Sequence, residues 1–248
     1  MRVLHLTDPH LFADTAADLR GTVTYLSLCA VLDHYRGDDW RADLVVVTGD
    51  LIQDESAQAY EHFCQLLAAL QLPVYCVPGN HDVRALMRDA ISGPPFYYCE
   101  SVEAGDWLIT GVDSCVSGQA GGQLDGDELA RLDREIANSR AANVMVCLHH
   151  PPVPLGSKWL DSVGLANGDE VLRRMAASGK VRLAIFGHVH QPYDTDHGGV
   201  RIIGTPSTCR QFAQGSDEFA VDDKPPAYRR ISLHGDGTYH HELVWLTT

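Results

Sequence analysis

The feature that most constrains this sequence is the alternation of short apolar runs with segments of helical periodicity. Runs rich in apolar and β-branched residues, each ending in polar residues, occupy 3–7, 44–48, 74–77, 107–112, 144–148 and 183–186. Such runs predict buried strands. Apolar residues at helical spacing lie between several of them, at 25–35, 60–70, 129–136 and 171–175. The alternation predicts an α/β core.

The pattern changes after residue 190. Strand-like runs at 201–204, 228–233 and 239–246 are separated by Gly, Pro and Asp, with no helical pattern between them. We expect antiparallel strands appended to a mixed sheet, with residues 2–204 as the α/β core and the tail completing or covering a sheet. At 248 residues, one large domain spanning 1–248 is expected.

Charge and cysteine content limit the partners and the kinds of site. The chain has 33 acidic and 19 basic residues, a net charge of −14, so it repels nucleic acid and anionic membranes. An anionic small molecule would need a strongly positive group in the site, which bound metal ions supply. The N-terminus lacks the pattern of a signal peptide, which predicts a cytoplasmic protein. Seven scattered cysteines without a C-x-x-C pair argue against disulfides and thiolate-bound zinc.

Polar clusters stand at the ends of the predicted strands. They are Asp-Pro-His at 8–10, Gly-Asp at 49–50, Gly-Asn-His-Asp at 79–82, His-His-Pro-Pro at 149–152 and Gly-His-Val-His at 187–190. The carboxyl ends of strands in an open α/β sheet border the ligand crevice, so all five clusters should converge. Alone, each has an ordinary explanation as a helix cap or a turn. Their joint occurrence favours a functional site.

The clusters supply carboxylate, imidazole and carboxamide donors without thiolates, a set that suits manganese, iron, cobalt or zinc. The candidate ligands are Asp8, His10, Asp50, Asn80, His149, His188 and His190. Two ions about 3.5–4 Å apart need a carboxylate that bridges them, and Asp50 is the expected bridge. Glycines beside these residues would allow close backbone approach at the mouth of the site.

The series D-x-H, G-D, G-N-H-D, H-x-P and G-H-x-H resembles that of the calcineurin-like metallophosphoesterases, over residues 3–190. The resemblance implies a four-layer α/β/β/α sandwich of two mixed sheets with a dinuclear centre, with iron or manganese expected and zinc or cobalt as alternatives. It assigns Asp8, His10, Asp50 and His190 to one ion, and Asp50, Asn80, His149 and His188 to the other. In this family the first histidine of H-x-P is the ligand, which here is His149. The roles of His150 and Cys209 stay open.

Segments outside these motifs, at 159–165 and 205–212, are similar to those of bacterial class III 3′,5′-cyclic AMP phosphodiesterases. This similarity implies hydrolysis of cyclic AMP to 5′-AMP by attack of a metal-bridging hydroxide, and we expect both segments to border the nucleotide. The segment 149–156 is equally typical of glycerophosphodiesterases, so a glycerophosphodiesterase or another nucleotide phosphodiesterase is the alternative. A non-catalytic scaffold of the same fold is a second alternative, and the oligomeric state is open.

His81 follows the candidate ligand Asn80 and is the candidate general acid for the departing 3′ oxygen, with Asp82 as a candidate to orient its ring. Its alternative role is that of a structural turn histidine. Asn80, His81 and His190 are also expected to contact the substrate.

Overall fold

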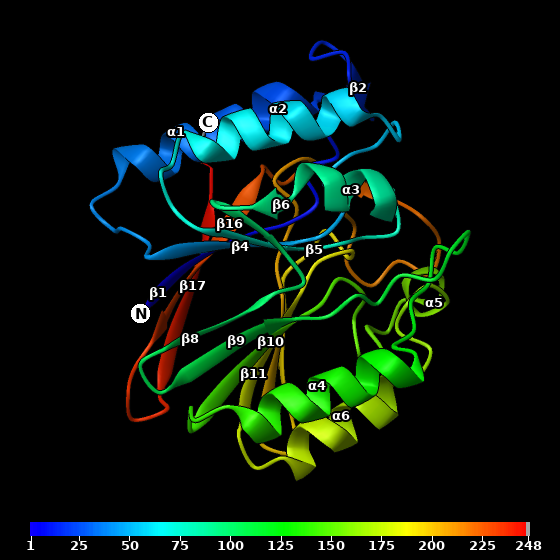
Figure 1. Ribbon diagram of the computed structural model, residues 1–248. Helices are drawn as coiled ribbons and strands as arrows, with labels where there is room; N and C mark the ends of the chain where they lie inside the picture. The colour runs from blue at the N-terminus through cyan, green and yellow to red at the C-terminus, as the bar shows by residue number, and fades with distance from the viewer. Residues whose placement is uncertain (247–248) are drawn as a thin grey trace.

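The computed structural model describes residues 1–246 and arranges them in four layers (Figure 1). Two sheets pack face to face. Helices α1 (Thr24–Gly37), α2 (Ala57–Ala68) and α3 (Arg84–Ala90) cover the outer face of the first sheet, and α4 (Gly126–Asn138) and α6 (Gly168–Ala177) cover that of the second. The expected α/β/β/α sandwich is confirmed.

The first sheet combines parallel strands from the start of the chain with antiparallel strands from its end. Its order is β17 (Tyr239–Trp245), β16 (Ala227–Leu233), β1 (Arg2–Leu6), β4 (Leu44–Thr48), β5 (Val74–Val77), β7 (Phe96–Tyr98) and β6 (Ser92–Gly93). Strands β1, β4, β5 and β7 are parallel neighbours, whereas β16 and β17 run antiparallel. The tail therefore completes this sheet, as expected.

The second sheet corrects one expectation. Its order is β12 (Tyr193–His197), β13 (Val200–Gly204), β11 (Val181–Phe186), β10 (Asn143–Cys147), β9 (Trp107–Gly111) and β8 (Ser101–Ala104). We expected 201–204 to be antiparallel; β13 is antiparallel to β12 but runs parallel to β11. The chain first forms β12 on the far side and then turns back to insert β13 between β12 and β11. Strand β12 is a largely exposed edge strand, so its sequence carries no apolar signal.

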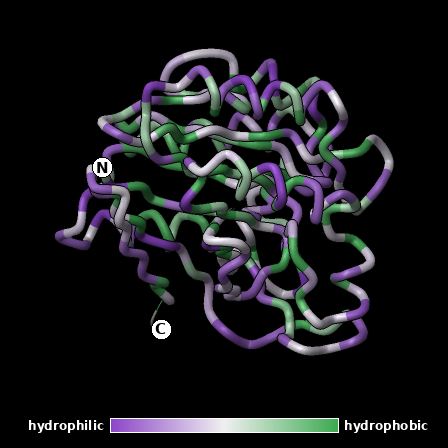
Figure 2. Tube along the Cα trace, turned by 90° about the horizontal axis from the view of Figure 1, so that it is seen from below, coloured by the Kyte–Doolittle hydropathy of each residue, from purple (hydrophilic) through white to green (hydrophobic). Residues whose placement is uncertain are grey.

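Burial on both faces explains the continuous apolar runs of the central strands. In β1, Val3 packs between the two sheets, whereas Leu4 and Leu6 pack beneath the helices of the first layer. Val46, Met145 and Ile185 extend the core between the sheets. Figure 2 shows hydrophobic stretches running through the middle of the molecule and hydrophilic stretches on many outer loops.

The helices follow their sequence signals where these are strong. Helix α4 is capped by the Asp125 side chain, which accepts a hydrogen bond of 2.9 Å from the backbone of Glu128. The sequence did not indicate α3, α5 (Lys158–Asp161) or two small hairpins, which are too short to show periodicity. The hairpins pair β2 (Asp18–Leu19) with β3 (Thr22–Val23), and β14 (Gln211–Phe212) with β15 (Val221–Asp222).

Within residues 1–246, every helix is too short or too polar to cross a membrane.

Candidate active site

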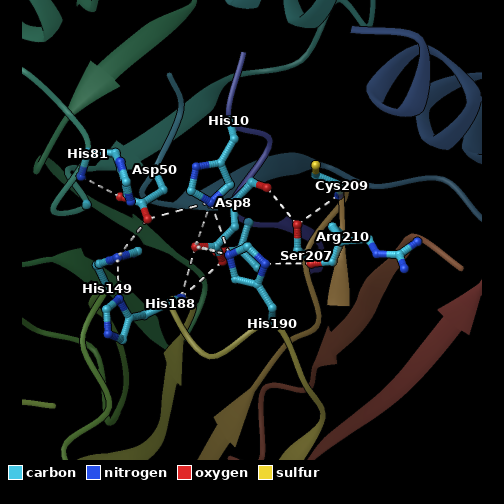
Figure 3. Close-up of polar contacts among 12 residues, drawn as sticks. Asp8, His10, Asp50, His81, His149, His188, His190, Ser207, Cys209 and Arg210 are labelled. Atoms are coloured by element: carbon cyan, nitrogen blue, oxygen red, sulfur yellow. Dashed lines mark hydrogen bonds and ion pairs between the residues drawn. The ribbon is translucent and has the colours of Figure 1, made fainter. Parts of the chain in front are cut away.

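The structure brings together all seven candidate ligands. Asp8 lies beyond the end of β1, Asp50 beyond β4, His149 beyond β10 and His188 beyond β11. Figure 3 shows side chains from both sheets pointing toward one another at this edge. Asn80 joins them from the turn after β5, and its side-chain oxygen contacts two of the histidines. The convergence expected from the strand ends is present.

The backbone at this edge is strained. Five candidate ligands have positive φ angles: Asp8 (52°), His10 (48°), Asp50 (52°), His188 (69°) and His190 (47°). A non-glycine residue in this region costs about 1–3 kcal/mol and persists only where surrounding structure enforces it. Such strain gathers at functional sites, and here it turns successive polar side chains inward.

Glycines allow close approach at the cluster, both between neighbouring strand ends of the first sheet and between the two sheets. A Cβ on Gly79 would lie 2.1 Å from Asp50 Oδ1, and one on Gly187 would lie 2.0 Å from Thr7 Oγ1. Both separations are far below contact distance, so only glycine fits. The interpretation that glycines beside the ligands permit close approach agrees with this geometry.

One half of the cluster is formed by Asp8, His10 and His190, beside Asp50. The Nε2 atoms of His10 and His190 are 3.0 Å apart. Asp8 Oδ1 lies 3.4 Å from His190 Nε2, and Asp50 Oδ2 lies 3.7 Å from His10 Nε2.

The other half is formed by Asn80, His149 and His188. Asn80 Oδ1 lies 3.1 Å from His149 Nε2 and 3.0 Å from His188 Nδ1. Asp50 Oδ2 lies 3.5 Å from His149 Nε2, so the same oxygen faces both halves. Donors bonded at about 2.0–2.1 Å to one ion are separated by roughly 3.0–3.4 Å from each other. The two halves fit two ions with Asp50 between them.

Backbone carbonyls select the ring nitrogen that faces the cluster. Nδ1 of His149 lies 2.7 Å from the carbonyl of Thr48, and Nδ1 of His190 lies 2.5 Å from the carbonyl of Arg210. A carbonyl only accepts, so each Nδ1 carries the proton and donates it. The lone pair of Nε2 is then directed into the cluster, as metal-binding histidines require.

Burial and charge favour a cation at this place. Burial lowers the pKa of His10 to about 3 and that of His188 well below its usual value, which leaves neutral rings able to bind metal. Burial also acts to lower the pKa of His149, but the Asp50 carboxylate outweighs it and raises the value to about 9, so a metal ion at Nε2 would replace a proton that this carboxylate attracts. Burial opposes ionisation of Asp50, yet His149 and His10 hold its pKa well below the usual value. The residues therefore fit the metal centre that their donor chemistry predicts.

His81 lies beside this centre, with a partner that differs from the expected one. Its backbone N–H donates to Asp50 Oδ1 at 2.9 Å, and its ring Nδ1 is 3.2 Å from Gln53 Nε2. Asp82 does not orient the ring, contrary to our expectation. Its carboxylate accepts hydrogen bonds from the backbone of Leu51 and Gly79 and from the Tyr60 hydroxyl. No sequence pattern indicated Gln53, which follows a strand end by several residues.

His150 and Cys209 have structural roles. The ring of His150 is buried, with Nδ1 2.8 Å from Ser114 Oγ and Nε2 3.2 Å from the carbonyl of Ala120. Both ring nitrogens are thus occupied away from the cluster, whereas Nε2 of His149 faces it. The backbone N–H of Cys209 donates to Ser207 Oγ at 2.8 Å, and its sulfur points away from the cluster in Figure 3.

A cavity of about 260 Å³ opens above the cluster. Its lining comprises His10, Leu19, Arg20, Asp50, Gln53, Asn80, His81, Ala120, Trp159, Val163, His188, His190, Arg210, Phe212 and Phe219. The two segments expected at the nucleotide side each contribute only part of their length. Most of 205–212 is buried behind the cluster, where Ser207 Oγ donates to the backbone carbonyl of Asp8 at 2.7 Å. Arg20 and Phe219 come from short hairpins that the sequence did not indicate.

Comparison with known proteins identifies the family to which this site belongs. The model of the calcineurin-like phosphoesterases matches residues 1–192. The chain belongs to this family. Its members use a dinuclear metal centre, and the His and Asp groups described above are candidates to hold it.

Relatives of similar length support the assignment. The chain is 38% identical to the 3′,5′-cyclic adenosine monophosphate phosphodiesterase CpdA of Pseudomonas aeruginosa, over 95% of this chain and 86% of that protein. Identity to the Escherichia coli K12 protein of the same name is also 38%, over 98% and 89%. A dimetal phosphatase from Danio rerio has the same fold, with a TM-score of 0.69 at 17% identity, over 93% of this chain and 94% of that one.

Proposed function

We propose that this family member is a metal-dependent phosphodiesterase that hydrolyses 3′,5′-cyclic AMP to 5′-AMP. The observation that carries the proposal is the pair of donor groups that meet at Asp50 on the floor of a small cavity. The names of the full-length relatives support cyclic AMP as the substrate. The cytoplasmic location and the single-domain organisation stay predictions.

The proposed ligand sets follow the two halves of the cluster. Asp8, His10, Asp50 and His190 would hold one ion, and Asp50, Asn80, His149 and His188 the other. Two bound ions supply positive charge for the phosphoryl oxygens and make water a nucleophile near neutral pH. Nitrogen and oxygen donors without thiolate favour iron or manganese, with zinc or cobalt as alternatives. Charge neutralisation at this place also lets an anionic substrate approach a chain of net charge −14.

The residues above the ions would position and protonate the substrate. We assign substrate contacts to Asn80, His81 and His190, which line the cavity beside the centre. The amide N–H of Gln53 faces His81 Nδ1, so that the other nitrogen, Nε2, carries a proton. In hydrolysis, water oxygen bonds to phosphorus and loses a proton to solvent, the bond from phosphorus to O3′ breaks, and O3′ takes a proton. His81 Nε2 is the proposed donor of that proton.

Hydrolysis by metal-reconstituted protein tests the proposal. Chelation should abolish turnover, Mn²⁺ or Fe²⁺ should restore it, and elemental analysis should approach two ions per chain. Full activity in metal-free protein would end the dinuclear proposal. The substrate panel should contain cyclic AMP, cyclic GMP, a glycerophosphodiester and an aryl diester, with cyclic AMP highest in kcat/KM. A glycerophosphodiester that exceeds cyclic AMP by tenfold or more would favour the glycerophosphodiesterase alternative, and no hydrolysis by metal-loaded protein would favour the scaffold.

A further inference from the structure

Three aromatic rings from separate segments form one wall of the cavity. Trp159 lies in α5, Phe212 in β14 and Phe219 in the turn before β15. The ring centroids of each pair are 5.2 Å apart, with interplanar angles of 70–73°. Phe212 is also stacked on His190, at 4.1 Å and an interplanar angle of 5°. The wall therefore begins at the proposed metal centre and leads outward from it.

Two features of this wall point to a ligand. The indole Nε1 of Trp159 is buried and has no hydrogen-bond partner among residues 1–246. A buried donor without a partner is costly, so a small shift of the ring that lets a bound molecule accept from Nε1 would be favourable. Phe219 lines the cavity and is 43% exposed, so its ring is open to a bound molecule.

Arg20 stands over the outer end of the wall. It lies in the turn between β2 and β3, and its guanidinium carbon is 4.3 Å from the centroid of the Phe219 ring. In the described part of the chain, no carboxylate pairs with Arg20, whereas Arg210 is 3.0 Å from Asp223. Arg20 therefore adds a free positive charge and a planar stacking surface at the mouth.

We propose that Trp159, Phe212 and Phe219 form a subsite that stacks the purine base of the nucleotide, with Arg20 closing it from the opposite hairpin. The inference rests on the proposed function. In a cyclic nucleotide the base lies beyond the ribose. A phosphate bound at the proposed metal centre would therefore direct the base outward along this wall. Purines offer a broad π face and ring nitrogens that accept a hydrogen bond from Trp159 Nε1. A cavity of 260 Å³ is below the usual size of ligand pockets and favours a mononucleotide over longer diesters.

A pair of substrates with the same reacting bond tests the subsite. Cyclic AMP has the base, and methyl β-ribofuranoside 3′,5′-cyclic phosphate lacks it. Phe219→Leu and Trp159→Leu should each lower kcat/KM for cyclic AMP about tenfold to a hundredfold, the range for loss of one base–aromatic stack. The base-free substrate should change less than about twofold. Val221→Ala is the matched control, because Val221 is 40% exposed near Phe219 and does not line the cavity.

Further variants separate the contributions within the subsite. Trp159→Phe keeps a ring but removes the N–H, and its loss on cyclic AMP should be smaller than that of Trp159→Leu. Arg20→Gln should lower kcat/KM for cyclic AMP more than kcat/KM for the base-free ester. Equal losses on both substrates in the Trp159 and Phe219 variants, at unchanged metal content, would overturn the inference and leave cyclic AMP hydrolysis intact. Unchanged kinetics on both would overturn it as well.

Binding provides a readout that does not depend on turnover. Calorimetry should show tighter binding of 5′-AMP than of ribose 5-phosphate to metal-loaded protein, and Phe219→Leu should remove most of the difference. This holds even if the wild-type chain fails to hydrolyse cyclic nucleotides, in which case the proposed function fails alone. Equal affinity of the wild-type protein for 5′-AMP and ribose 5-phosphate would overturn the subsite itself.

Discussion

The floor of the cavity and its walls are held in different ways. The floor consists of the seven candidate ligands, which lie just beyond buried strands and are almost all inaccessible to solvent. The walls, including Arg20, Gln53, Trp159 and Phe219, come from short helices, hairpins and turns. Strand ends fix side chains rigidly, whereas turns can vary without disturbing the core. The difference suggests that the floor performs the chemistry common to the family and the walls choose the substrate.

Among the floor and wall residues, loss of the shared carboxylate Asp50 should have the largest effect on turnover. Asp50→Ala should lower turnover about 10⁴-fold or more, because in the proposed centre this one residue serves both ions and several kcal/mol of charge stabilisation depend on them. His190→Ala, which removes a ligand of one ion, should be less severe. Metal content measured by elemental analysis should collapse in Asp50→Ala.

Asp223→Asn is a suitable control, since the Asp223 side chain is 99% exposed and, within residues 1–246, forms an ion pair only with Arg210. If Asp50→Ala kept two ions per chain, the bridge would belong to another residue.

His81 lies where floor and wall meet, and its effect should depend on the leaving group. On cyclic AMP, His81→Ala should lower kcat roughly 10²–10⁴-fold, the range for general acid catalysis. The loss should be much smaller on bis(p-nitrophenyl) phosphate, because p-nitrophenolate departs without a proton. Both rates are to be measured with bound metal determined in the same samples.

Equal losses on the two substrates at full metal occupancy would remove the leaving-group role. If His81 instead bound the phosphoryl oxygens as a cation, KM would rise on both substrates with the metal retained.

Metal binding at the floor should also depend on residues that support the ligands from behind. Ser207 Oγ donates to the Asp8 carbonyl at 2.7 Å and accepts from the Cys209 N–H at 2.8 Å. Ser207→Ala should weaken metal binding about 10–100-fold, as loss of contacts outside the direct ligands usually does. Turnover at saturating metal should change little. Metal titration checks this, with Ser232→Ala on the distant β16 as control, and an unchanged affinity would show that the strained Asp8 turn holds without the hydroxyl.

The sequence predicted the convergence of the floor residues for a physical reason. A buried parallel strand has an apolar run on both faces, and a polar residue at its end has to face the crevice, so Asp8, Asp50 and His188 could be found from pattern alone. The walls could not, because Arg20 and Phe219 meet only through tertiary packing of hairpins two residues wide. Asp82 was expected to orient His81 because the two residues are adjacent in sequence. In the structure, the Asp82 carboxylate instead accepts hydrogen bonds from backbone N–H groups, and Gln53 contacts the His81 ring from another turn.

Gln53 offers the smallest and sharpest prediction, because it should act on catalysis only through His81. Its amide nitrogen is 3.2 Å from His81 Nδ1, and donation there keeps the proton of the neutral ring on Nε2, where the leaving oxygen needs it. Gln53→Leu should lower kcat on cyclic AMP about twofold to tenfold, the effect of one hydrogen bond. Bis(p-nitrophenyl) phosphate and metal content should be nearly unaffected.

A double-mutant cycle separates this positioning role from direct substrate contact, since Gln53 also lines the cavity. If Gln53 acts through the ring, Gln53→Leu should cost nothing further in a His81→Ala background. If it binds the substrate itself, the loss should persist there and should raise KM rather than lower kcat. Gln53→Glu, which keeps an acceptor but loses the donor, should shift the pH profile of the wild-type background by stabilising a protonated His81. Independent, additive effects of the two substitutions would show that Gln53 and His81 do not act as a unit.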